Sequence, residues 1–368
     1  MPIAELLEIP VAPITAGRAL AELRREFARR GWNKREPGPI NLAMVIHTAL
    51  LVAGMVLGLW AWNMLSGILC FALVSTGILI SGIGSTGIGT TTHTSSHFAA
   101  SANRRVNELL TFLGYSILSG FSATYWWRDH VSRHHSSPNV PGADDTIDFL
   151  PLFALTESEV DRASGWVQKY YRNWQALVLP FMFGLLVINM QRTGWIQLLR
   201  HLRDPRIRRG THVVDLLGLL SHLVLFFGLP LLYAPLSHVV VFYLARQALV
   251  SVGLVVLLAP AHLPAETPVV TREQANAIGH CALQTYTTIN YNGGRFVHLM
   301  ATGLNYQIEH HLFPEISHVH YVKMAPFVAE FCREQGLPYR TWSLSKALWE
   351  SYKVFMRAKR MDINLATL

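Results

Sequence analysis

Two long stretches of this chain carry no charged side chain. Neither residues 41–103 nor residues 216–245 contain Asp, Glu, Lys or Arg. A helix needs about 20 consecutive apolar residues to cross the hydrocarbon core of a bilayer, so both stretches are long enough to span a membrane. Only 15% of the 368 residues are charged, whereas a soluble domain has about a quarter. The sequence therefore predicts a polytopic membrane protein.

Turn signals divide each stretch into a pair of helices. "AWNML" (61–65) interrupts the first stretch, and "YAP" (233–235) interrupts the second. We expect four transmembrane helices, at residues 41–62, 65–88, 213–232 and 236–258. The second helix should continue to His93, about 42 Å at 1.5 Å per residue, so its end should project past a hydrocarbon core of about 30 Å. An arginine at mid-membrane is costly, so we expect Arg246 near the interface.

Positive charge predicts how these helices are oriented. Three segments are basic, at residues 18–35, 192–209 and 346–360, while the two turns carry no charge. Because Lys and Arg accumulate on the cytoplasmic side of membrane proteins, both termini and the middle basic segment should be cytoplasmic. Much of the formal net charge of +8 is then expected to meet the lipid bilayer, and not nucleic acid.

This orientation requires two helical hairpins. The short apolar stretch 174–190, which contains Pro180, must then be interfacial and not spanning. We therefore expect a basic cytoplasmic segment at residues 1–40, followed by a membrane domain at residues 41–368.

The 17 histidines fall into isolated and grouped positions. His47, His222 and His238 lie singly in apolar helices, where a packed, hydrogen-bonded histidine is the ordinary interpretation. We expect surface or interfacial positions for His201, His212, His318 and His320. Seven others are grouped in "HTSSH" (93–97), "HVSRHH" (130–135) and "QIEHH" (307–311), and His262 stands alone after the fourth helix.

The spacing within these three motifs brings their side chains together. In "HTSSH" the two histidines are four residues apart, so they share one helical face. "HVSRHH" repeats this spacing with a third histidine one step round, and in "QIEHH" the glutamine and the last histidine are again four apart. Three helices that each offer two or three such groups to a common point can hold two transition-metal ions. The alternative, a coincidence of core histidines, leaves buried imidazoles that need partners.

The residue types narrow the choice of metal. Imidazole suits zinc, copper, iron and nickel. The HExxH signature is absent, and only "EISH" (315–318) has the ExxH spacing that soluble di-iron bundles use twice. Cys70, Cys281 and Cys332 show no CxxC spacing and indicate neither a disulfide framework nor a zinc–cysteine site. Two histidine-held irons beside a lipid-buried pocket would suit oxygen activation against an unactivated C–H bond, an inference from chemistry and not from spacing.

The three boxes, their order between two hairpins and the segment "LNYQIEHHLFPEISHVHYVKMAP" closely resemble membrane fatty acid desaturases. The glutamine that opens the third box resembles the front-end branch and its bacterial relatives. "WWRDHVSRHHSSPNVPGADDTIDFLP" resembles the second-box region, and "AHLP" with "LQTYTTIN" resembles the stretch before the third box. The resemblance covers about residues 40–340. It implies an all-α integral membrane protein, expected in a bacterial inner membrane, in which a cytoplasmic helical cap on four transmembrane helices holds a di-iron site.

The resemblance also implies a set of metal ligands. The family's iron ligands fall on His93, His97, His130, His134, His135, His310 and His311. His262 matches an additional ligand position after the last membrane helix. Gln307 stands where other branches have histidine and is expected to be a weak or water-mediated ligand. His280 is a further candidate, for which a surface or outer position is the favoured alternative.

Other residues are expected to support this site. Asp129, Asp144, Asp145, Asp148 and Glu309 are candidates to accept hydrogen bonds from ligand imidazoles, with a solvated acidic turn as the alternative for 144–148. The glycines of "SGIGSTGIG", Gly82, Gly84, Gly87 and Gly89, would leave space for an acyl chain, or else allow close helix packing.

The predicted function is O2-dependent desaturation of a lipid- or thioester-linked acyl chain. The sequence has no HPGG motif of a fused cytochrome b5 domain, so we expect a separate electron donor, of ferredoxin or cytochrome b5 type. Cations near the boxes would steer an acidic donor: Arg104, Arg105, Arg128, Arg133, Arg295 and Lys323. Gly303 replaces a histidine of animal front-end enzymes, which leaves regiochemistry open. A related hydroxylase or ketolase, and a histidine-rich metal transporter, remain alternatives.

Overall fold

The computed structural model describes residues 14–360, so residues 1–13 of the expected N-terminal segment and 361–368 of the membrane domain lie outside it. In the described part, four helices are long and apolar enough to cross a membrane: α2 (Pro37–Met64), α3 (Gly67–Ser96), Gly210–Leu232, and α11 (Leu236–His262). The third consists of α10 (Gly210–Leu223), η4 (Val224–Gly228) and η5 (Pro230–Leu232). The four expected spans are confirmed, with ends that differ by a few residues.

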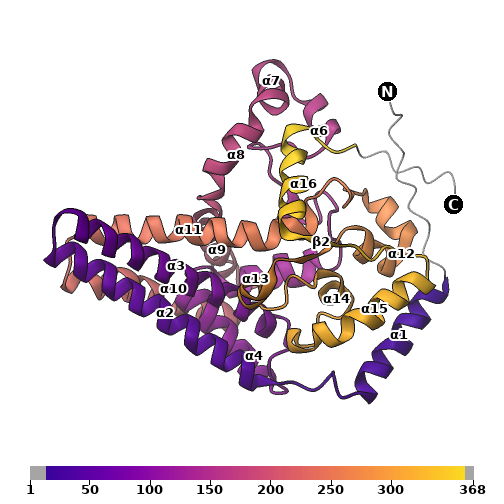
Figure 1. Cartoon of the computed structure of the whole chain (residues 1–368), viewed down its shortest axis with the longest axis horizontal. Coiled ribbons are helices and arrows are strands. Elements are labelled where there is room, and N and C mark those ends of the chain that lie inside the picture. The colour runs from indigo at the N-terminus through magenta and orange to yellow at the C-terminus, as the bar shows by residue number, and fades with distance from the viewer. Residues whose placement is uncertain (1–13, 361–368) are drawn as a thin grey trace.

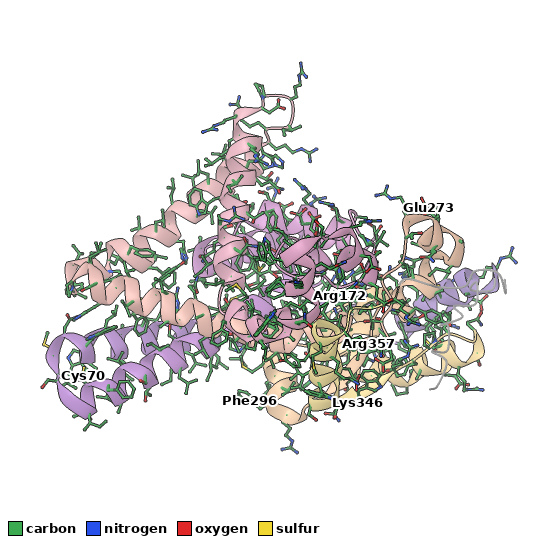
Figure 2. All side chains as sticks on the ribbon, turned by 90° about the horizontal axis from the view of Figure 1, so that it is seen from above. Cys70, Arg172, Glu273, Phe296, Lys346 and Arg357 are labelled. Atoms are coloured by element: carbon green, nitrogen blue, oxygen red, sulfur yellow. The ribbon has the colours of Figure 1, made fainter. Side chains whose placement is uncertain are left out.

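These helices form an arm that extends from a compact cap (Figure 1). Figure 2 shows the arm from above, with Cys70 at its far end. The first half of α3 presents exposed apolar side chains such as Ile68 and Phe71, as a lipid-facing surface should. From Ser81 to its end α3 is buried except at Ile83. The C-terminal half of this helix is therefore enclosed by protein.

Small residues let α3 pack closely against its neighbours. A Cβ on Gly84 would lie 2.4 Å from the Leu51 backbone nitrogen on α2. On Gly87 it would meet the His47 ring, also on α2, and on Gly82 it would be 2.5 Å from Leu249 on α11. The interpretation of these three glycines as space for an acyl chain is therefore wrong, because helices and side chains already fill that space.

The apolar stretch after residue 174 is bent. It forms α8 (Gln175–Phe183) and the start of α9 (Leu186–Arg203), whose axes differ by 72°. In Figure 1, α8 runs steeply across the direction of α11. Trp174, at the N-cap of α8, and Leu177 and Phe181 on α8 are exposed. This arrangement is compatible with the expected interfacial position, which stays a prediction.

The cap is built mainly from α1 (Ile14–Arg29), α12 (Arg272–Tyr286), α14 (Gln307–Leu312) and α15 (Tyr321–Glu334). Their common core includes Phe27 of the basic first helix, whose ring lies 5.1 Å from that of Phe313. One turn earlier on α1, Arg24 pairs with Glu315 at 2.8 Å. The amphipathic N-terminal helix is thus packed on the cap that holds the third box.

Shorter elements connect the arm and the cap. They are α4 (Arg104–Thr111), η1 (Phe112–Ser119), α5 (Ala123–Trp126), η2 (Trp127–His134), η3 (Asp145–Ile147), α6 (Glu157–Arg162), α7 (Gly165–Asn173), α13 (Gly294–Ala301), η6 (His318–His320) and α16 (Leu344–Met356). Two short parallel strands, β1 (Asn290–Asn292) and β2 (Thr341–Ser343), pair beside α16. The predicted all-α architecture is confirmed apart from this pair.

Arg246 is not in the expected place. It lies well inside α11, is fully buried, and stacks on the rings of Phe226 and Tyr243, at 4.4 Å and 4.8 Å. Aromatic faces attract a cation, so the protein supplies the environment that lipid does not. The expectation of an interfacial arginine is therefore wrong.

The isolated histidines follow the predictions in part. His47, His222 and His238 are hydrogen-bonded to Thr91, Tyr243 and Asn63, as expected for packed histidines. His212 and His320, by contrast, are buried and not at the surface. The three cysteines are free.

Candidate metal centre

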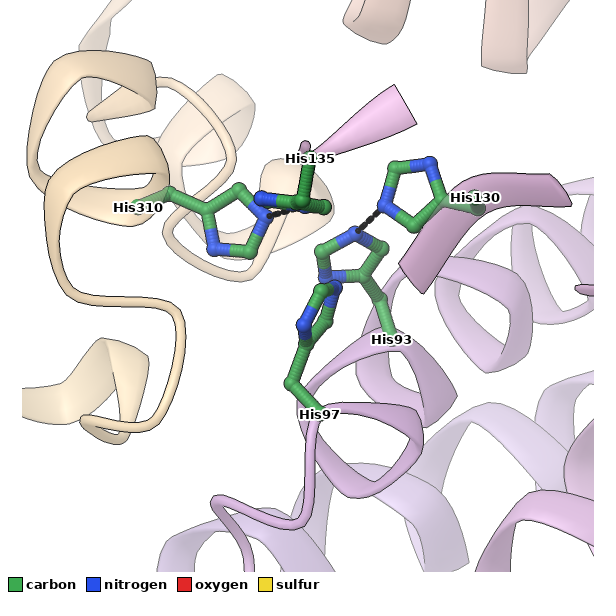
Figure 3. A group of neighbouring side chains, drawn as sticks. All are labelled: His93, His97, His130, His135 and His310. Atoms are coloured by element: carbon green, nitrogen blue, oxygen red, sulfur yellow. Dashed lines mark hydrogen bonds between the residues drawn. The ribbon is translucent and has the colours of Figure 1, made fainter. Parts of the chain in front are cut away.

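The grouped histidines meet where the arm joins the cap. Ligand atoms of His93, His97, His130, His135 and His310 all lie within 4.8 Å of one another, and we name this group cluster 1 (Figure 3). His134, His262 and His311 form a second group under the same limit, cluster 2. All eight side chains are buried. The structure therefore brings the seven box histidines and His262 together in two adjacent groups.

Cluster 1 joins three distant segments. Nε2 of His93, from α3, lies 2.7 Å from Nε2 of His130, from η2. Nε2 of His310, from α14, lies 3.0 Å from Nε2 of His135. Two nitrogens that each lie about 2.1 Å from one ion at a right angle are about 3 Å apart, so these separations fit shared coordination. The buried Nε2 of His97 finds no hydrogen-bond partner within residues 14–360, so its lone pair is available to a metal.

Cluster 2 lies on the other side of His135. The ring centroid of His134 is 4.7 Å from that of His262 and 5.0 Å from that of His311. The Gln307 amide nitrogen is 2.9 Å from Nε2 of His262 and 3.4 Å from Nε2 of His311. Its buried amide oxygen has no partner among the described residues. Gln307 thus borders cluster 2, where its oxygen or a water held by it would complete a ligand set.

The second box departs from the helix geometry expected for it. Residues 127–134 form a π-helix, and the His135 amide donates to the His130 carbonyl five residues back. The rings of His130 and His134 stack at 5.0 Å, yet His130 joins cluster 1 with His135 while His134 joins cluster 2. Such π-helical turns are rare and occur often at functional sites. One short helix therefore serves both groups.

Most of these imidazoles are held neutral. Burial, followed by repulsion from neighbouring imidazoles, lowers the pKa values of His130, His135, His310 and His311 well below their usual range. A neutral imidazole keeps the lone pair that a metal needs. The donor set, eight buried imidazoles in two groups, fits a pair of transition-metal ions.

Three neighbours fix the direction of these lone pairs. Nδ1–H of His134 donates to Asp144 at 2.9 Å, and Nδ1–H of His310 donates to the Tyr321 hydroxyl at 3.1 Å. Nδ1–H of His311 donates to the Gln284 amide oxygen at 2.7 Å, while the Gln284 amide nitrogen donates to the His135 carbonyl at 3.0 Å. A proton held at Nδ1 leaves Nε2 free to face a metal.

Comparison with known proteins agrees with this site. The sequence profile of the family described as "Fatty acid desaturase" matches residues 71–343, which include all three boxes. The chain belongs to the fatty acid desaturase family. It is 28% identical over 278 residues to the "Delta(5) fatty acid desaturase fat-4" of Caenorhabditis elegans, covering 73% of this chain and 60% of that protein.

Two further relatives are similarly distant. The "Delta(8)-fatty-acid desaturase" of Euglena gracilis is 29% identical over 69% of this chain and 60% of its own length. The chloroplastic "Acyl-lipid (7-3)-desaturase" of Chlamydomonas reinhardtii is 30% identical over 72% of this chain and 52% of its own. The chain thus spans 52–60% of the length of these three relatives.

Most of the acidic groups expected to orient the ligand histidines of this desaturase contact other residues or solvent instead. Asp129 and Asp145 pair with Arg133, and Asp148 is exposed. Glu309 accepts hydrogen bonds from Tyr339 and Asn290, and burial raises its pKa to about 7. Of the five candidates, the contacts found place only Asp144 on a ligand histidine. The sequence offered no local signal for Gln284 or Tyr321, which reach the histidines through the fold.

Two more histidines of this desaturase fold lie outside both clusters. His280 is exposed and belongs to neither cluster, as its favoured alternative supposed. His318, expected at the surface, borders a cavity of about 10 Å³ beside His93, His97 and His310, and its Nδ1 is 2.6 Å from the Thr94 hydroxyl. That volume suits a single water molecule.

Proposed function

We propose that this chain is an O2-dependent fatty acyl desaturase that introduces a cis double bond with two iron ions held by clusters 1 and 2. The observation that carries the proposal is the pair of buried histidine groups at the junction of the arm and the cap, in a chain of the desaturase family. Two electrons, two protons and O2 would be consumed for each pair of hydrogens removed from adjacent methylenes, giving an alkene and two water molecules.

Iron at the two clusters would supply the one-electron redox chemistry that O2 activation and C–H cleavage require. The chain's own residues bury the site, keep most of its imidazoles neutral and fix their direction. Asp144, Gln284 and Tyr321 each hold one Nδ1 proton, so that the opposite nitrogen faces inward. Because a methylene offers no polar handle, its position relative to the clusters must decide which carbons react.

The substrate is an acyl chain linked to a lipid or to a thioester. The printed name of one relative, an acyl-lipid desaturase, supports the lipid-linked form. The charge distribution supports a site on the cytoplasmic side, served by a separate electron donor. A bacterial inner membrane stays a prediction, since the relatives named above are eukaryotic.

Two alternatives make different predictions. A hydroxylase or ketolase would use the same clusters and differ only in the position and outcome of oxidation. A metal transporter would be expected to bind its ion near the midplane of its spans. Here the ligands lie at the C-terminal ends of α3 and α11 and in the cap, which supports an enzyme.

Fatty acid analysis of cells that express the chain tests the proposal. We expect a new cis double bond in extracted acyl lipids, and its loss in His134→Ala and His310→Ala variants that still reach the membrane. His201→Ala, which changes a histidine outside both clusters, is the matched control. Hydroxylated or keto products would favour the alternative enzyme. Active protein with one zinc per chain, instead of two irons, would contradict the di-iron assignment.

A further inference from the structure

A basic hollow lies on the surface between the start of α2 and the loop that follows α3. Its volume is about 750 Å³, and its lining includes Lys34, Arg35, Phe98 and Asn107. No carboxylate is among the described residues that line it. The Arg104 guanidinium, on α4, lies 5.1 Å from the centre of the Phe98 ring beside the hollow, where it also pairs with Glu108 at 2.9 Å.

Phe98 has a backbone conformation that is uncommon for its type. It follows the cluster 1 residue His97 directly and has a φ of 57°, in the left-handed region. A bulky residue in this region carries strain, and such strain gathers at functional sites. The Phe98 ring stacks on Trp127, with ring centres 6.1 Å apart and planes 12° from parallel. The Phe98 ring thus lines the hollow, and its stacking partner Trp127 leads from there into the protein.

Trp127 and its neighbour Trp126 connect this wall to cluster 1. The Trp127 indole N–H donates to the Ser96 carbonyl at 3.0 Å, and that carbonyl belongs to the peptide bond with His97. The Trp126 indole N–H donates to the Ser96 hydroxyl at 3.1 Å, and its ring stacks on His130 with centres 4.3 Å apart. A continuous path of stacked rings, hydrogen bonds and covalent bonds therefore runs from the surface to the candidate ligands.

We propose that this hollow docks a small acidic one-electron donor, and that Trp127, Ser96 and His97 conduct its electrons to the metal of cluster 1. The inference rests on the proposed function, which requires two electrons per turnover. In each transfer the reduced donor loses one electron and the metal centre gains it, and no bond forms or breaks. Electron tunnelling is faster through bonded and stacked atoms than across a gap, which favours this entry point.

Charge supports an acidic partner at this place. Complementary charge guides an electron donor to its docking site. Complexes between redox partners bury little surface, below about 1,200 Å² in total. Arg133, expected from the sequence to serve the donor, is tied to Asp129 and Asp145, and Arg128 also contacts Asp129. Lys34 is exposed and forms no ion pair among those found in residues 14–360. The hollow therefore presents an exposed cation that forms no ion pair among those found in the described residues.

The test uses full-length protein in lipid nanodiscs, with and without metal, and two acidic probes, a soluble cytochrome b5 and a plant-type ferredoxin. One variant combines Lys34→Glu with Arg104→Gln. The other, Trp127→Phe, keeps an aromatic ring against Phe98 but removes the N–H bond to Ser96. The matched controls are Arg172→Glu on α7, which lies on the opposite side of the molecule from α4 in Figure 1, and Trp349→Leu on α16.

We expect the charge variant to bind one of the probes about tenfold more weakly than the wild type at low salt. At high salt, the affinity of the wild type should fall towards that of the charge variant. Trp127→Phe should bind that probe normally but oxidise it several-fold more slowly, while reduction by dithionite is unchanged. Both controls should match the wild type. Binding and single oxidations need no acyl substrate, so these outcomes can be read even if no double bond forms.

Two results would overturn the inference. In the first, both probes bind and become oxidised equally well in the wild type and in the two variants. In the second, the charge variant raises KM for the acyl substrate while donor binding is intact, which would assign the hollow to a lipid headgroup.

Discussion

Replacing Gln284 with leucine should weaken metal binding at cluster 2. The change removes the acceptor for His311 and the donor to the His135 carbonyl, two hydrogen bonds of 2.7 Å and 3.0 Å inside a fully buried site. Loss of a group that orients a metal ligand typically costs about tenfold to a hundredfold in metal affinity. That range equals about 1.4–2.8 kcal/mol of binding free energy. Each buried polar group left without a partner also costs about 1–3 kcal/mol of folding stability.

Titration of metal-free protein with Fe(II) or Co(II), followed by elemental analysis, measures the effect. Gln284→Glu is the informative second variant, because its carboxylate restores an acceptor for His311 but no donor for His135. It should bind metal better than the leucine variant. Gln274→Leu is the matched control on the same helix, since Gln274 caps α12 at Thr271 and touches no cluster histidine. Equal metal affinity in the wild type and Gln284→Leu would refute the argument that Gln284 orients His311.

Three further predictions concern packing, topology and pH. Gly84→Ala should lower the thermal midpoint, since overpacking costs about 1–3 kcal/mol. Gly89→Ala should not lower it, because a Cβ there would lie 3.6 Å from its nearest neighbour. Equal midpoints for the two variants would refute the packing argument. In a cysteine-free background, a cysteine at Asn63 should label from outside the cell and one at Arg206 should not; the reverse result would contradict the predicted orientation. Burial lowers the Lys359 pKa to about 7, so the unfolded chain binds more protons and stability should rise from pH 7 towards 10.5. Lys359→Met should flatten that slope in thermal melts, and an unchanged slope would assign it to another group.

Features that depend on local composition could be predicted from the sequence. The four spans follow from uncharged runs of sufficient length, and the box histidines follow from spacing along single helices. The boundaries shifted because α2 begins at Pro37, before the uncharged run, and because α3 continues through polar residues to Ser96. Other segments of the same chain surround those polar residues, and a hydropathy profile does not detect such contacts.

Features that depend on residues distant in the sequence could not be predicted from the sequence. Gln284 acquires its role because α12 packs beside α14, and nothing in "LQTYTTIN" marks the glutamine that meets His311. Asp144 and Asp129 are equally acidic in the sequence, but arginines occupy Asp129 while Asp144 faces His134. Arg246 was misplaced because its stacking partner Phe226 comes from another helix.

His310 and His311 are adjacent in the sequence, so a single peptide bond joins the two clusters. Each of these neighbours on α14 serves a different cluster. Consecutive Cα atoms are about 3.8 Å apart across a trans peptide bond, a distance that no loop movement alters. The separation of these two ligand backbones is therefore fixed by a peptide bond, and their ring centres lie 5.5 Å apart. The other six histidines come from separate segments of the chain, so α14 is where the spacing between the two clusters is most tightly constrained.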